Sequence, residues 1–208
     1  MNFRFYADDS SVIVPRIEAC LHDIATWMSL NKVKLNGEKT ELLVIGLQHL
    51  KASQIPSFTA VDGTIIQPSQ SASNIGVIFD NKLNLERQVA AICKSAFFHI
   101  RNLSRIRKFL SVGTTKMLVH AFVTCRLSNC NSLLYVLPKY LIHRLQLVRN
   151  CPARLVLCGR KYEHITPLLK ELHRLPVEQR IVFKILLLTF KALHNLSPSY
   201  IRGLLQTY

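Results

Sequence analysis

The sequence predicts an α+β protein, in which a small antiparallel sheet with one helix is followed by an all-α helical region. Short β-branched runs separated by turn residues fill residues 1–82, and from residue 83 the apolar residues recur with the period of a helix. The charge changes at the same place. Residues 1–82 contain seven Lys/Arg and eight Asp/Glu, whereas residues 83–208 contain the other twenty and four. We therefore expect two domains, 1–82 and 83–208.

Length and composition indicate a chain that buries a core. Of its 208 residues 49% are hydrophobic, which argues against disorder. The longest apolar stretch, residues 181–193, is interrupted by two lysines and is too short to cross a bilayer. No signal peptide is expected at the N-terminus. The six cysteines form no Cys-x-x-Cys pair, which favours buried reduced thiols over metal ligands. We expect an intracellular protein, cytoplasmic or nuclear, without a membrane partner.

The first element is expected to be a β-hairpin that presents two carboxylates. An apolar run at residues 3–6 is followed by Asp8 and Asp9, and residues 12–14 form a second, β-branched run. Adjacent carboxylates at a rigid turn suit a Mg²⁺-dependent nucleotidyltransferase, because hard cations take oxygen ligands. A solvated hairpin tip is the alternative, since Asp is also an ordinary turn residue.

A helix, a strand and a second hairpin are expected next. Apolar residues with helical spacing from Ile17 to Met28 predict a helix that ends near Leu30. Residues 41–45 have the composition of a short buried strand. Two further strands, 57–61 and 64–67, flank the tight-turn dipeptide Asp62-Gly63 and predict a hairpin. A strand that ends at residue 79 closes this region.

The remainder is expected to be helical. A stripe with helical spacing begins the region, formed by Leu85, Val89, Ile92, Ala96, Ile100 and Leu103. Later helices are expected over residues 114–135, 139–157, 165–173, 178–195 and 199–206, separated by prolines. Pro152 is expected to kink or end its helix, because proline lacks the backbone N–H that continues it.

Several segments carry a family resemblance. The tetrapeptide Tyr6-Ala7-Asp8-Asp9 resembles the catalytic hairpin of reverse transcriptases. In the right order along the chain, later segments are similar to LINE-type (non-LTR) retrotransposon reverse transcriptases: residues 73–80, 118–124, 131–135, 144–150 and 175–181. By this resemblance the chain is a C-terminal fragment, with the end of the palm followed by the thumb and a C-terminal helical region.

The resemblance implies an RNA-directed DNA polymerase that works by two-metal nucleotidyl transfer. Its cofactor would be Mg²⁺, and its partners an RNA template and a DNA primer. Asp8 and Asp9 would be the catalytic metal ligands, with Tyr6 and Ala7 beside the primer or nucleotide. Lys39 matches a lysine implied to protonate pyrophosphate, and its alternative role is that of a surface lysine capping a turn.

The chain also departs from the family pattern. The family takes a further metal-binding aspartate from a strand upstream of the hairpin, and this sequence has none there. We therefore expect no polymerase activity from this chain alone. Ser128-Asn129 and Cys151-Pro152 replace what is usually Asp-Tyr and a pair of small residues.

The basic second half points to nucleic acid, because such an excess of Lys/Arg neutralises phosphates. Solvated helix faces are the alternative. Without catalysis, the chain would be a basic helical nucleic-acid-binding module, or a protein that self-associates through exposed apolar faces. The candidate phosphate contacts are Arg101, Arg105, Arg107, Lys108, Arg144, Arg149 and Arg154, with Arg160 and Lys161 nearby.

Overall fold

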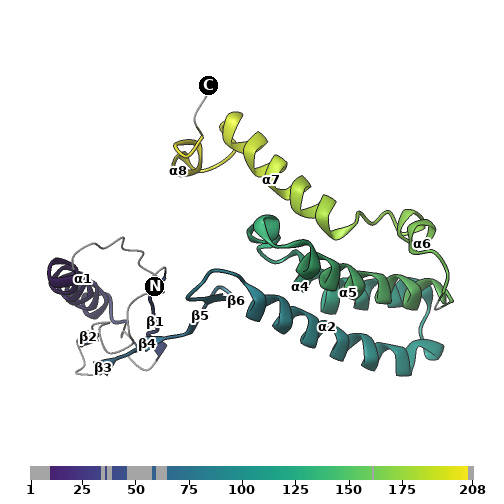
Figure 1. The fold of residues 1–208 in the computed structure, drawn as a ribbon, viewed down its shortest axis with the longest axis horizontal. Helices are drawn as coiled ribbons and strands as arrows, with labels where there is room; N and C mark the ends of the chain where they lie inside the picture. Colours follow the sequence, from purple (N-terminus) through teal and green to yellow (C-terminus); the bar gives the residue numbers. More distant parts are fainter. Residues whose placement is uncertain are drawn as a thin grey trace. The chain divides into compact units, whose positions relative to one another are not determined.

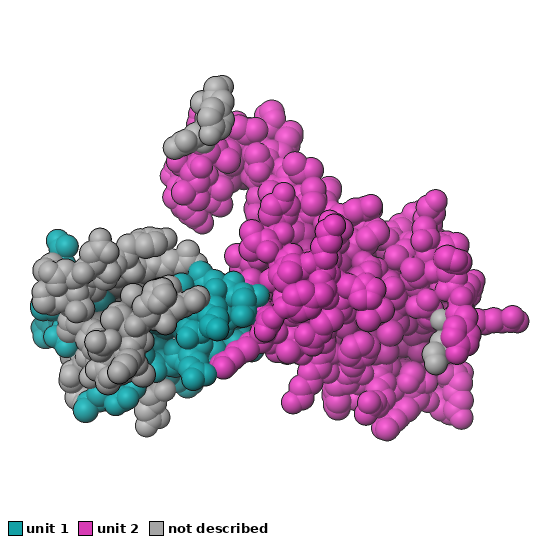
Figure 2. All heavy atoms as spheres, in the orientation of Figure 1, with its two compact units in different colours: residues 1–84 teal, residues 85–208 magenta. Residues whose placement is uncertain are grey.

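The computed structural model describes residues 10–33, 36, 39–45, 58–59, 65–160 and 162–205. The chain divides into two compact units, Met1–Asn84 and Leu85–Tyr208 (Figure 2). This division lies two residues beyond the boundary that charge and periodicity predict. Among the described residues, unit 1 holds the strands and one helix and unit 2 is built from helices, so the fold class is α+β as expected.

Unit 1 begins with helix α1, Ser10–Leu30 (Figure 1). The helix predicted to end near Leu30 is confirmed. The expected second strand of the first hairpin is wrong, because residues 12–14 belong to this helix. β-branched residues disfavour a helix only weakly, so adjoining helical sequence outweighs their preference. Tyr6, Ala7, Asp8 and Asp9 lie outside the described residues.

The described strands form three two-stranded sheets. The predicted hairpin is confirmed in its strands, with Phe58 opposite Ile66, while its Asp62-Gly63 turn lies outside the described residues. The strand expected over residues 41–45 is shorter, and its pairing is parallel. The pairs are β1 (Leu42–Leu43) with β4 (Pro68–Ser69), β2 (Phe58–Thr59) with β3 (Ile65–Ile66), and β5 (Ser71–Asn74) with β6 (Val77–Asp80).

Residues 73–80, expected as one strand, are parts of the β5–β6 hairpin. Its two central turn residues, Ile75 and Gly76, have φ values of 49° and 74°. Positive φ at both positions defines a type I′ turn, whose twist matches that of the flanking strands. Gly76 adopts this conformation without strain, whereas the branched Ile75 does not. The unfavourable residue at the first turn position explains why sequence reasoning missed the hairpin.

A buried carboxylate at the end of β6 stabilises the turn that follows this strand. Asp80 is 5% exposed, and its Oδ1 accepts hydrogen bonds from the backbone N–H groups of Lys82 at 3.0 Å and Asn84 at 3.1 Å. An aspartate that bonds backbone two residues ahead is a common turn-former.

Unit 2 is helical in its described part. The prediction for residues 139–157 is confirmed, whereas the helix expected over 114–135 is broken into four pieces. The elements are α2 (Glu86–Ile106), the 3₁₀ turn η3 (Arg107–Phe109), α3 (Val112–Val119), the π-helical turn η4 (His120–Thr124), α4 (Cys125–Ser128), the 3₁₀ segment η5 (Asn131–Val136), α5 (Lys139–Leu157), α6 (Ile165–Glu171), α7 (Val177–Leu193) and α8 (Ser199–Arg202).

The core of unit 2 forms where α2 packs on α5. Both helices run in the same direction, because Tyr140 hydrogen-bonds Glu86 at their N-terminal ends and Arg107 reaches the C-terminal end of α5. Pro152 lies inside α5 and is fully buried, so of the two expected outcomes the end of the helix is wrong, and a kink stays a prediction. Burial of its ring offsets the missing hydrogen bond. The side chains with 0% exposure here include Val89, Ala96, Leu141, Leu145 and Val148.

Helix α7 is covered on one side only. Its described buried residues are Val177, Ile181 and Ala192. Four large side chains on the helix are more than half exposed: Phe183, Leu186, Phe190 and Leu193. Their spacing places them on one face of the helix. This is the kind of exposed apolar face that the sequence led us to expect, and self-association through it stays a prediction.

Arg107 joins the C-terminal ends of α2 and α5. Its Nε donates to the Leu155 carbonyl, its Nη2 to that of Val156, and its Nη1 to that of Leu110, each at 2.9 Å. The last carbonyls of a helix have no partner within the helix and carry a partial negative charge. A guanidinium supplies both the donors and the positive charge that they require.

Replacing Arg107 with alanine should lower the free energy of unfolding by about 2 kcal/mol, because charge-assisted bonds to two helix-end carbonyls are lost. Chemical denaturation of the full chain measures the change. The matched control is Arg105→Ala, two residues earlier and exposed, which should stay within about 0.5 kcal/mol of the wild type. Equal losses in the two variants would contradict a capping role.

Of the six cysteines, all free, only Cys93 is buried, while Cys125 and Cys158 are exposed. The expectation of buried thiols therefore holds for one residue. Burial raises the pKa of the Cys93 thiol above its ordinary value of 9.0, and the nearby Arg144 partly opposes this rise. Burial likewise raises the pKa of Cys151. The hydrogen bond to Glu86 is the main cause of a raised pKa at Tyr140.

The stability of the protein should fall as the pH rises above about 9. The unfolded Cys93 thiol then loses its proton while the folded one keeps it, so unfolding is favoured increasingly until the folded pKa is passed. Cys93→Ala should flatten the decline, leaving the part due to Cys151 and Tyr140. Urea unfolding midpoints between pH 7 and 10.5 provide the measurement. An identical slope in the wild type and in Cys93→Ala would refute the assignment to Cys93.

Candidate nucleic-acid interface

The exposed face of α2 carries a row of cations with a phenylalanine among them. Lys94, Phe98, Arg101 and Arg105, here called the α2 stripe, are all exposed. Their spacing of four, three and four residues places them on one side of a helix. The opposite side is buried at Val89 and the other apolar positions of α2. The amphipathic pattern that packs α2 into the core thus also aligns its cations.

Phe98 of the α2 stripe is the first of three aromatic rings that lie next to one another. The ring centroids of Phe98 and His99 are 5.3 Å apart in an edge-on arrangement, and those of His99 and Phe122 are 5.0 Å apart and nearly parallel, at 18°. Phe98 is 61% and Phe122 43% exposed. Phe122 belongs to the π-helical turn η4, the kind of local irregularity that is frequent at functional sites. We call these three residues the aromatic cluster.

The charged side chains of the α2 stripe are all positive. The only acidic residue of α2 is Glu86 in its first turn, and the α2 stripe contains none. Arg144 of α5 is exposed and acts on the thiol of Cys93, the neighbour of Lys94, so α5 adds positive charge beside α2. Clustered cations of this kind attract polyanions and steer their approach.

The predicted phosphate contacts separate into two groups. Arg101, Arg105, Lys108 and Arg144 are exposed, and the Lys108 Nζ lies 4.8 Å from the centre of the Phe109 ring. Arg160 is exposed as well, and Lys161 lies outside the described residues. The other three candidates either bond to backbone carbonyls of the protein or are buried: Arg107, Arg154 and Arg149.

The second group is unsuited to surface contacts. Arg107 caps α5, and the Arg154 Nη2 donates to the Glu163 carbonyl at 3.0 Å. Arg149 is 2% exposed, so a phosphate on the surface does not reach its guanidinium. Sequence reasoning missed Lys94 and the aromatic cluster. The helical spacing of Lys94, Phe98, Arg101 and Arg105 was the signal that could have identified the stripe.

The catalytic residues implied by the resemblance are only partly described. Lys39 is exposed, and its backbone N–H donates to Asn36 Oδ1 at 3.2 Å, while both roles considered for its side chain stay predictions. Among the described residues no group of three metal-ligating side chains occurs. The Asp80 carboxylate bonds backbone, and Asp23 lies exposed on α1. The described residues therefore give no fit for Mg²⁺.

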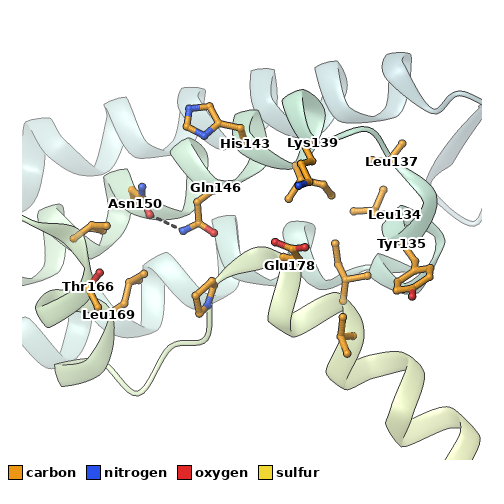
Figure 3. Close-up of a pocket in the computed structure, with 15 residues that line it drawn as sticks. Leu134, Tyr135, Leu137, Lys139, His143, Gln146, Asn150, Thr166, Leu169 and Glu178 are labelled. Carbon is orange, nitrogen blue, oxygen red and sulfur yellow. Dashed lines mark hydrogen bonds between the residues drawn. The ribbon is translucent and has the colours of Figure 1, made fainter.

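A pocket of about 660 Å³ lies between η5, α5, α6 and the start of α7 (Figure 3). Two of its polar lining residues, Gln146 and Asn150, take part in holding the helices together. Gln146 accepts a hydrogen bond from the Val177 backbone N–H at 2.8 Å and donates to Asn150 at 2.7 Å. These bonds attach the first turn of α7 to α5. The pocket thus marks where α7 joins the core, and nothing in its lining resembles a nucleophile paired with a base.

Comparison with known proteins adds no family. A scan against protein-family models finds no match, and searches of the curated proteins and of the solved structures find none either. Within the part of the chain that the structure describes, every helix is too short or too polar to cross a bilayer.

Proposed function

We propose that the helical unit Leu85–Tyr208 is a basic nucleic-acid-binding module that contacts a single strand through α2. The observation that supports it most directly is the α2 stripe, in which Phe98 lies among Lys94, Arg101 and Arg105 with no carboxylate between them. Modules that bind single strands combine a cationic track for the backbone with aromatic rings on which bases stack. The aromatic cluster and the α2 stripe supply these two parts side by side.

The dimensions agree with a short strand. Lys94 and Arg105 are eleven residues apart, which corresponds to roughly 16 Å along a helix. Three cations over this length neutralise about three phosphates, and counterion release then gives a salt slope of about −2 on logarithmic axes for a single strand. Arg144 and Lys108 would add to that slope.

Two substitutions should separate stacking from charge. Phe98→Ala should weaken binding of a labelled 12-nucleotide single strand about 5- to 160-fold, because stacking contributes about 1–3 kcal/mol per base, and it should leave the salt slope unchanged. Arg101→Gln should reduce the slope by about 0.7. Fluorescence anisotropy between 50 and 200 mM salt measures both effects.

The control is Lys191→Gln, an exposed cation on α7, which should bind like the wild type. A thermal melt of each variant verifies that it is folded. The proposal fails if affinity is flat across salt, or if the two α2 variants bind as the control does.

We further infer, from the ordered resemblance, descent from a LINE-type reverse transcriptase, with the helical unit as its thumb and C-terminal region. The polymerase function assigned to Asp8 and Asp9 gains no support from the described residues. Helix α1 occupies the position of the expected second strand, and no described carboxylate completes a metal site. We therefore propose that this chain binds nucleic acid without polymerising DNA by itself.

Primer extension on an RNA template tests this second inference. The purified 208-residue chain with Mg²⁺ and deoxynucleotides should extend the primer no more than the Asp8→Ala variant does. Asp8→Asn should leave strand binding unchanged, because the α2 stripe lies in the other unit. Mg²⁺-dependent synthesis that Asp8→Ala abolishes would overturn the inference and would establish the polymerase.

A further inference from the structure

A buried arginine without a partner lies in α5. Arg149 is 2% exposed, and its Nε and Nη2 have no hydrogen-bond partner among the described residues. These two nitrogens share one edge of the guanidinium plane. That edge presents two parallel N–H groups, the arrangement that binds two oxygens of a carboxylate or phosphate. The exposed arginines of unit 2, such as Arg101 and Arg144, face solvent, whereas this edge of Arg149 faces the protein interior.

The charged groups that act on Arg149 are both positive. They are Arg180 on α7 and Arg174 in the segment before α7. We call Arg149, Arg174 and Arg180 the basic cluster. Burial, with the help of these two arginines, lowers the pKa of Arg149 to about 10, and burial with Arg180 lowers that of Arg174. No described carboxylate is among the groups that shift either pKa.

Two neutral side chains form hydrogen bonds with Arg180. The Arg180 Nη2 donates to Ser128 Oγ at 2.6 Å, and the buried Asn131 donates to the Arg180 carbonyl at 3.5 Å. With a pKa near 10, Arg149 still carries its charge at neutral pH. A buried charge is costly unless an opposite charge pairs with it. Within the part of the chain that the structure describes, no carboxylate is found to pair with the basic cluster.

We propose that the basic cluster binds a small oxyanion of the phosphate class, held on the unpartnered edge of Arg149 and flanked by Arg174 and Arg180. The burial of Arg149 favours a small ion over a nucleic-acid strand, which would remain at the surface. The site is separate from the α2 stripe and goes beyond the proposed strand binding. Because its residues come from α5, α7 and the segment before α7, the bound ion ties α7 to the core.

Thermal unfolding of the full chain in inorganic phosphate tests the site. Phosphate is titrated from 0 to about 50 mM at pH 7.5, with sodium chloride holding the ionic strength constant. A ligand that binds only the folded state raises the Tm. We expect a saturable rise in the wild type, superimposed on the gradual rise that phosphate gives any protein through exclusion from its surface.

Two variants locate the effect. Arg149→Met removes the unpaired charge while keeping an unbranched side chain, so its Tm without phosphate should exceed that of the wild type and its saturable rise should be absent. Ser128→Asp places a carboxylate beside the Arg180 guanidinium, and it should raise the Tm and weaken the apparent phosphate affinity at least tenfold. Ser199→Asp, the same change at an exposed position on α8, should respond to phosphate as the wild type does.

Three results would overturn the proposal. The first is a rise in Tm without saturation that is equal in the wild type and in Arg149→Met. The second is a saturable rise that persists in both Arg149→Met and Ser128→Asp. The third is a saturable rise with a 12-nucleotide strand, lost in Arg149→Met, where inorganic phosphate gives none, since that result would assign the cluster to the nucleic acid.

Discussion

The packing of α2 against α5 is the constraint on which the helical unit depends, and Arg107 holds one end of it. A single guanidinium satisfies carbonyls at the end of α5 and one just beyond η3, and it places a positive charge where the helix dipole is negative. At the other end Tyr140 meets Glu86. With the buried side of α2 fixed in this way, its outer side is presented as a rigid row of cations and rings. The orientation of the candidate interface thus follows from the packing of α2 on α5.

Arginines of unit 2 serve three purposes that composition does not distinguish. Arg101 and Arg105 face solvent, Arg107 caps a helix, and Arg149 is buried against other cations. The periodicity of α5 does distinguish one of them. Leu145, Val148 and Pro152 mark its buried side, and position 149 falls on that side, four residues after Leu145. An arginine on an apolar stripe is expected to face the core. This rule would have excluded Arg149 from the candidate phosphate contacts.

Sequence reasoning succeeded where the periodicity of a segment agrees with the proline or turn residues at its ends. The bounds of α5 follow from its apolar stripe and from Pro138 before it, and the β2–β3 strands follow from the turn signal between them. It failed where a local preference competes with its context. Ile75 in a left-handed turn conceals the β5–β6 hairpin, and residues 12–14 join α1 in spite of their β-branched composition. The aromatic cluster was not predictable, because the contact between His99 and Phe122 depends on how η4 packs against α2.

The contact between Arg107 and α5 joins residues that are 48 and 49 positions apart in the chain. Because α2 and α5 are parallel, the segment between them must return to the N-terminal end of α2 before α5 can pack. Closing this loop costs conformational entropy before any contact between the two helices offsets it. Folding of the helical unit should therefore be slower than its helical content suggests, since rates follow the sequence separation of native contacts.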